Sequence, residues 1–168
     1  MPNSYSNFEV IRVTPTIDTN AYGAGEVLFT TTEIPNAVIG NGGCSKLLGV
    51  WVLSQSGGVQ KDISLVFMEN NTSIGTVNSA PSISDPDAEA VNILGTIPNI
   101  DAGNTDVDLG GVKIFGGGTQ LGQSSVAIPI LLQAAAGSTS VYFAGLAKEA
   151  ATYEAADDLD FIFHIQKK

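Results

Sequence analysis

The chain has little of the chemistry that most enzymes and nucleic-acid-binding proteins need. Its 168 residues include one cysteine, Cys44, one histidine, His164, and seven lysine and arginine residues in all. A single cysteine excludes an internal disulfide, and so few cysteine and histidine ligands exclude the common zinc sites. Binding to a phosphate backbone needs clustered basic side chains, which the sequence lacks. We therefore predict neither an enzyme nor a nucleic-acid-binding protein.

Long hydrophobic runs and a secretory signal are also missing. The longest apolar stretch, residues 127–136, contains Pro129 and Gln133. It falls short of the roughly 18 residues that a membrane-spanning helix needs. The N-terminal residues have neither the basic segment nor the hydrophobic segment of a signal peptide. We expect a soluble protein that is made in a cytoplasm and binds no membrane.

The residues that are present describe an acidic, weakly charged domain. Charged residues make up 14% of the chain, and 17 acidic residues against 7 basic ones give a net charge of −10. The usual charged share is about 25%, so polar uncharged residues and glycine must supply much of the surface. The length suits one domain, and we expect a single domain over residues 1–168.

The hydrophobic pattern predicts an all-β fold. Glycine and proline, 19 and 7 residues, separate short runs rich in β-branched and aromatic residues. Eight runs are predicted as strands: 8–17, 26–34, 45–55, 62–70, 112–122, 126–135, 141–150 and 159–168. A helix of two or three turns is predicted within residues 82–94, where Ala88, Val91 and Leu94 share one face. Eight strands in two halves predict an antiparallel β-sandwich of the jelly-roll type.

Details of the strand pattern lead to three further expectations. Phe8 and Val10 point to one side of the first run and Ile11 to the other, so we expect this strand to be covered on both sides. The third and fourth runs are expected to form a hairpin, because a short glycine-containing loop separates them. Trp51, the only tryptophan, is expected in the core or at a subunit interface.

Acidic side chains gather in three places where oxygen ligands could hold calcium. They are Asp85, Asp87 and Glu89 at the helix start, Asp101, Asp106 and Asp108 in one loop, and Asp157, Asp158 and Asp160 in another. Acidic residues also stabilise a helix N-terminus, and aspartate is common in solvated turns. We therefore predict capping and turn formation here, and neither a metal site nor a cofactor.

The remaining candidate groups have ordinary structural interpretations. No nucleophile motif such as G-x-S-x-G accompanies His164, and nothing near Cys44 in the sequence indicates a reactive thiol. The glycines of residues 116–118 are expected in a bulge or a close subunit contact, because no phosphate-binding motif surrounds them. Four tyrosines allow a second interpretation, in which they stack on a sugar instead of covering strand edges. These are Tyr5, Tyr22, Tyr142 and Tyr153.

Two segments resemble one known family of proteins. They are VTPTIDTNAYGAGEVLFTTTEIPNAV, over residues 13–38, and LGVWVLSQSGGVQKDISLVFMENNTSIGTVNSAPSISDPDAEAVNILG, over residues 48–95. Both are similar to small virion structural proteins of tailed, mostly marine, bacteriophages. Those proteins share the motifs TP-x-[IL]-D-T-x-x-Y-x-x-G-[ED]-V-L-F and L-V-F-x-x-x-N-x-S-x-G-T-x-N-[SA]. Residues 100–168 match more loosely, through VDLGG and SVYFAGLAKEAATY.

The resemblance implies a structural component of the virion. We expect a capsid decoration, or cement, protein that binds the major capsid protein on the outside of the phage head and stabilises the shell. Local three-fold positions on a shell suit a homotrimer, and low charge suits subunit packing. The residues predicted for the interface are Trp51, Tyr142 and Phe143. Alternative expectations are a tail, knob or fibre component, and a carbohydrate-binding attachment module.

Overall fold

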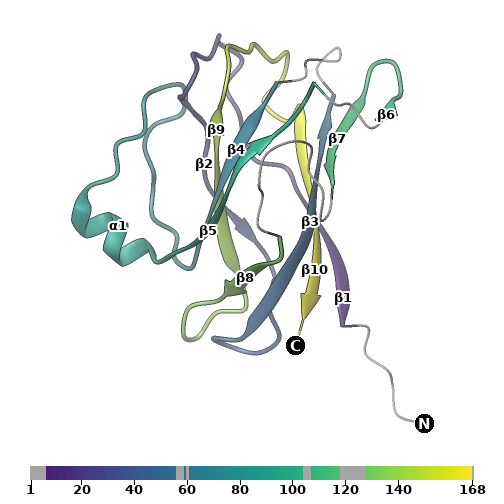
Figure 1. Cartoon of the computed structure of the whole chain (residues 1–168). Coiled ribbons are helices and arrows are strands. Elements are labelled where there is room, and N and C mark those ends of the chain that lie inside the picture. Colours follow the sequence, from purple (N-terminus) through teal and green to yellow (C-terminus); the bar gives the residue numbers. More distant parts are fainter. Residues whose placement is uncertain (1–6, 56–58, 60, 104–106, 118–127, 168) are drawn as a thin grey trace.

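A computed structural model of the chain shows two antiparallel sheets that face each other (Figure 1). It describes residues 7–55, 59, 61–103, 107–117 and 128–167. The first sheet has the strand order β1-β10-β3-β7-β6, and the second has the order β2-β9-β4-β5. The chain crosses from one sheet to the other at most connections, as in a jelly roll. The predicted all-β sandwich is therefore confirmed.

Each of the eight predicted runs overlaps a strand, but the strands in runs 8–17 and 141–150 end at Val13 and Ala147, earlier than predicted. The first sheet consists of β1 (Phe8–Val13), β10 (Leu159–Lys167), β3 (Cys44–Ser54), β7 (Lys113–Gly117), β6 (Val107–Asp108) and β8 (Ile130–Gln133). The second sheet consists of β2 (Val27–Ile34), β9 (Val141–Ala147), β4 (Ile63–Met68) and β5 (Ile93–Ile100). β7 pairs with the C-terminal half of β3 and β8 with its N-terminal half. The two short strands thus share one position in the sheet.

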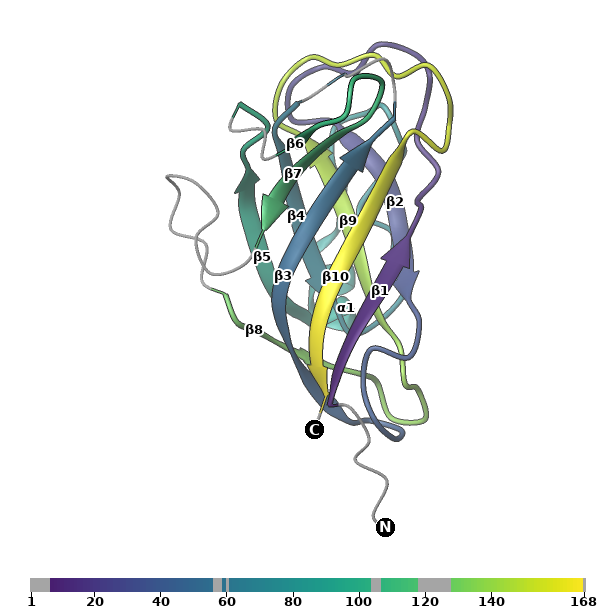
Figure 2. The same cartoon turned by 90° about the vertical axis from the view of Figure 1, so that its right-hand side faces the viewer.

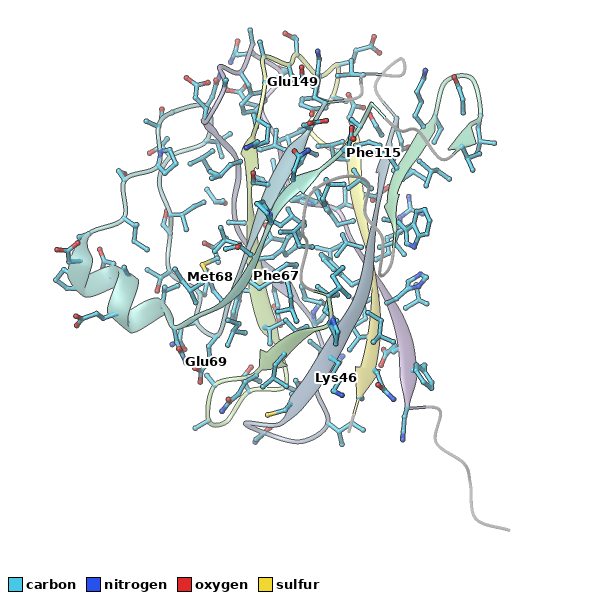
Figure 3. The ribbon with its side chains drawn as sticks, viewed as in Figure 1. Lys46, Phe67, Met68, Glu69, Phe115 and Glu149 are labelled. Carbon is cyan, nitrogen blue, oxygen red and sulfur yellow. The ribbon has the colours of Figure 1, made fainter. Side chains whose placement is uncertain are left out.

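Aromatic rings fill the space between the sheets. The ring of Phe143 on β9 lies 5.1 Å from that of Phe29, 5.4 Å from that of Phe161 and 4.9 Å from that of Phe163, measured between centroids. These edge-on contacts are a favourable geometry for aromatic pairs. Figure 3 shows Phe67 and Phe115 in the same interior layer. The alternation predicted for the last strand is confirmed, since its inward side chains are buried.

A second, smaller core lies on the outside of the second sheet. The connection between β4 and β5, residues 69–92, packs Ile74 and Val91 against Met68 and other side chains that point away from the main core. Met68 is fully buried, although it follows the inward-facing Phe67 and points to the opposite side of the strand. Figure 1 shows this connection, with its helix α1 (Asp85–Val91), outside the second sheet. The chain therefore covers this outer face itself.

The helix has seven residues, about two turns, which agrees with the prediction, and a strand follows it at once. The hydroxyl of Ser84 caps α1 by accepting from the amide of Asp87 at 3.3 Å. The helix ends at Val91 because Asn92 has a left-handed backbone, with a φ of 51°. Leu94 therefore leaves the predicted helical face and belongs to β5. Sequence analysis had not predicted this strand.

The hairpin expected between the third and fourth runs is wrong. β3 and β4 lie in different sheets, where β3 pairs with β10 and β4 pairs with β9. The connection after Ser54 thus crosses from the first sheet to the second. A short glycine-containing loop is compatible with both a hairpin and such a crossing, so loop length alone did not distinguish them.

Candidate interaction surface

The outer face of the first sheet carries apolar side chains that remain exposed. Figure 2 shows this sheet toward the viewer. Phe8 and Val10 on β1 are 60% and 63% exposed, and Leu131 on β8 is 57% exposed. We call this outer side of β1, β10, β3, β7 and β8 the open face. Its other apolar members, all half-buried, are Leu48, Trp51, Leu53, Ile114 and Ile162. Our expectation that β1 is covered on both sides is wrong, because the described chain covers its inner side only.

Trp51 and Ile162 lie near the middle of the open face. They are direct cross-strand partners on β3 and β10, and Gly116 of β7 is the partner of Trp51 on its other side. Gly116 has a φ of +108°, and a Cβ there would lie 2.5 Å from the carbonyl oxygen of Val50. A side chain is therefore excluded beside the indole. We predicted a bulge or a close subunit contact for the glycines of residues 116–118, and the close approach of Gly116 is to β3 of its own chain.

An ion pair between a buried carboxylate and an exposed guanidinium lies at one end of this face. Asp160 on β10 is 1% exposed, and its carboxylate forms a salt bridge with the guanidinium of Arg12 on β1. The hydroxyl of Thr14 and the amide of Gln55 donate to the same carboxylate. Burial alone would raise the pKa of Asp160, but these donors outweigh it and hold that pKa below its ordinary value. The carboxylate is thus satisfied and withdrawn from solvent.

The open face differs in charge from the molecule as a whole. The chain has a net charge of −10. Asp160 is the only carboxylate among the described residues that point outward from these strands, and Arg12 neutralises it. Lys46 of β3 also points to this side, next to Leu131 of β8 (Figure 3). An apolar surface with so little charge has the composition of the centre of a protein interface.

The three residues predicted for an interface occupy different environments. Trp51 lies half-buried on the open face and not among the buried core residues. Tyr142 lies half-buried on the outer side of the second sheet, packed against the smaller core. Phe143 is fully buried between the sheets, so its side chain cannot contact a partner in this structure. Its neighbour Tyr142 points outward because side chains alternate along a strand.

Two of the four tyrosines proposed to stack on a sugar are buried. Tyr22 and Tyr153 are 2% and 3% exposed, and their ring centroids are 6.0 Å apart. The Tyr22 hydroxyl donates to the carbonyl of Leu28 at 3.0 Å and accepts from the amide of Asp18. Burial raises the pKa of both tyrosines. They stabilise the start of β2, and Tyr5 lies outside the described residues.

The acidic groups mainly organise turns. Asp158 accepts from the backbone amides of Glu154 and Ala155, both at 2.8 Å. Asp101 accepts from the amide of Gly103 at 2.8 Å. A hydrogen bond from Lys113, 3.0 Å away, lowers the pKa of Asp108. Asp106 lies outside the described residues. Within the described part of the chain, no three histidine, cysteine, aspartate or glutamate side chains are grouped to hold a metal ion.

The single histidine and cysteine lie far apart on the first sheet. His164 is exposed on the open face, where Val10 and Gly49 are its cross-strand partners. Cys44 is an exposed free thiol at the start of β3, opposite Gln133 of β8. Neither side chain has a carboxylate or nucleophile among these cross-strand partners.

Comparison of the chain with models of known protein families gave no match, and neither did comparison with curated proteins. In the described residues, no helix has the length and hydrophobicity to cross a membrane.

The sequence pattern of β1 indicates the open face, although we had interpreted that pattern as a strand covered on both sides. The two-sided apolar pattern of residues 8–13 predicted that the chain would cover both sides of β1. In the described part of the chain Phe8 and Val10 are 60% and 63% exposed, so the same pattern indicates a surface for another molecule. The ion pair between Arg12 and Asp160 had no detectable signal, because it joins residues 148 positions apart.

Proposed function

We propose that the chain is a virion structural protein, a capsid decoration protein that binds the major capsid protein on the outside of a phage head. The observation that carries this proposal is the open face, where Trp51, Ile162 and Val10 lie on a regular sheet with little charge. A rigid sheet offers a preformed surface, so binding orders few side chains. The resemblance of residues 13–38 and 48–95 to small virion proteins points in the same direction.

The acidic charge supports a position on the exterior. A net charge of −10 disfavours contact with packaged DNA and keeps an abundant surface protein soluble. The acidic helix α1 lies on the side of the molecule away from the open face (Figure 1). Docking through the open face would therefore direct the helix toward solvent and leave its carboxylates hydrated.

Co-sedimentation with phage heads tests this proposal. Heads assembled from the major capsid protein without this chain are mixed with the wild-type chain, with Ile162→Glu at the centre of the open face, or with Ile93→Glu. Ile93 is 51% exposed on β5 in the second sheet, which makes it a control for the same change away from the open face. We expect the wild type and Ile93→Glu to bind alike and Ile162→Glu to bind at least about tenfold more weakly, because it places a charge in an apolar contact.

Three results would contradict the proposal. The wild-type chain could fail to bind heads, or it could bind purified tails instead. The third is that Ile162→Glu and Ile93→Glu weaken binding to heads equally. The melting temperature of each variant shows whether it is folded. A glycan array examines the carbohydrate-binding alternative separately, and strong binding there would favour an attachment module. Burial of Tyr22 and Tyr153 has already removed two of its four candidate stacking side chains.

A further inference from the structure

β1, at one margin of the first sheet, has few of the features that stop an edge strand from pairing with another chain. Monomeric proteins protect such strands by shortness, proline, charged side chains, β-bulges or a covering loop. β1 has six residues, pairs with β10 in an unbroken register and contains neither proline nor lysine, and its two charged side chains, Glu9 and Arg12, form salt bridges with β10. Its side chains Phe8 and Val10 are 60% and 63% exposed. Such a strand is a template for strand addition.

The other strands at the sheet margins have protective features. β6, at the opposite margin, is two residues long, and β8, which pairs with β3 on the same side of the sheet, has four residues. β5 contains Pro98, and its register with β4 is interrupted in two places. The register of β2 with β9 is interrupted in two places as well. In addition, the β4–β5 connection bonds both backbone groups of Val27 at the start of β2, to Asn78 and Ser79, each at 2.9 Å. β1 is the exception among the five.

The charged side chains of β1 form salt bridges within their own sheet. Arg12 forms its salt bridge with Asp160, and Glu9 forms one with Lys167, and both partners belong to β10. Two copies with a net charge of −10 each repel one another over most of their surfaces. The repulsion is weakest at the open face, where the one outward carboxylate is neutralised. Electrostatics therefore favours contact between copies at this margin over contact elsewhere.

We infer that two copies of the chain pair edge to edge through β1, antiparallel and about a two-fold axis at Val10. In this register Val10 lies opposite Val10 of the second copy, and Phe8 lies opposite Arg12 of the second copy. The guanidinium of Arg12, whose side chain is 57% exposed, can then lie over the ring of Phe8. The contact is the same on both copies, as a two-fold axis requires.

Edge pairing extends the open face. A two-fold axis perpendicular to the sheet joins the first sheets of both copies into one sheet and leaves both open faces on the same side. This inference goes beyond the proposed binding to a phage head and does not depend on it, since the pair forms without heads. It predicts a dimer, whereas the symmetry of a shell led us to expect a trimer.

Light scattering coupled to size exclusion tests the pairing on the purified full chain. We expect the wild type to have twice the monomer mass of 17.3 kDa. Val10→Lys places two like charges opposite each other and should raise the dissociation constant at least about tenfold. Leu131→Lys is the matched control, because Leu131 is 57% exposed on the same face but on β8. It should remain a dimer. A monomeric or trimeric wild type, or equal effects of the two variants, would overturn the inference.

A cysteine crosslink tests the register even if Val10→Lys does not fold. The free thiol is first removed by Cys44→Ser, and Val10→Cys is then introduced. Directly opposed strand residues have Cα atoms about 4.5–5.5 Å apart, within the range of a disulfide. Mild oxidation should therefore give a covalent dimer of Val10→Cys and a monomer of the Leu131→Cys control. The inference fails if Val10→Cys stays monomeric or if both variants crosslink equally. Neither outcome bears on binding to heads.

Discussion

The outer faces of the two sheets differ in what covers them. Both carry apolar side chains, but the β4–β5 connection covers the second sheet, whereas no described segment covers the first sheet. Met68 on the covered face is fully buried, whereas Val10 on the open face is 63% exposed. This fold can therefore cover the outer face of a sheet with a segment of its own chain. The uncovered apolar side chains therefore indicate a surface kept for another molecule.

The largest expected effect compares a residue of the covered face with one of the open face. Met68→Ala removes a fully buried side chain and should lower the free energy of unfolding by about 2–5 kcal/mol. Val10→Ala should change it by less than about 0.5 kcal/mol in dilute, monomeric protein. Urea denaturation of both variants measures the difference. Equal losses would mean that the two faces contribute alike to the stability of the monomer.

Asp160 gives the next largest effect and a pH dependence. Asp160→Ala removes a buried carboxylate that accepts hydrogen bonds from Arg12, Thr14 and Gln55, and should destabilise the protein by about 1.5–3 kcal/mol. The pKa of Asp160 is lowered in the folded protein, so the ionised carboxylate contributes stability above the unfolded value of about 3.9. That contribution is lost as the pH falls through the folded pKa.

Denaturation at several pH values checks this sign. Wild-type stability should fall more steeply below about pH 4 than that of Asp160→Asn, which cannot lose a negative charge at this position. Parallel curves for the two proteins would show that the carboxylate of Asp160 does not stabilise the fold by its charge.

A smaller effect is expected in the segment that covers the second sheet. Ser84→Ala removes the hydroxyl that caps α1 and should lower the stability by about 1 kcal/mol. Hydrogen exchange should become faster in residues 85–91, while exchange in β1 should not change. If exchange increased equally in both regions, α1 would unfold only together with the whole domain. The β4–β5 connection would then not unfold independently of the sheets.

The smallest effect is expected from Leu131→Ser on the open face. Leu131 is 57% exposed, so the free energy of unfolding of the variant should stay within about 0.5 kcal/mol of that of the wild type. Differential scanning fluorimetry of the variant and the wild type measures any difference in melting temperature. A clear loss would mean that this part of the open face is covered within the monomer.

Prediction from sequence succeeded where a local pattern determines the structure. The strict alternation of residues 159–165 placed β10 and its inward side chains correctly. β5 was missed because ILGTIPNI combines glycine and proline with no clear alternation, and because Leu94 extended the helical pattern. Asp160 was assigned to an acidic turn, since its partner Arg12 lies at the other end of the chain. Long-range pairs of this kind follow from topology, which the local sequence does not encode.

The most direct test of the account is a cryo-electron microscopy map of the intact virion. We expect the jelly roll on the exterior of the head, with the sheet of β1, β10, β3 and β7 against the shell and α1 toward solvent. Density for the chain in the tail or inside the head, or a jelly roll that touches the shell through α1, would contradict it.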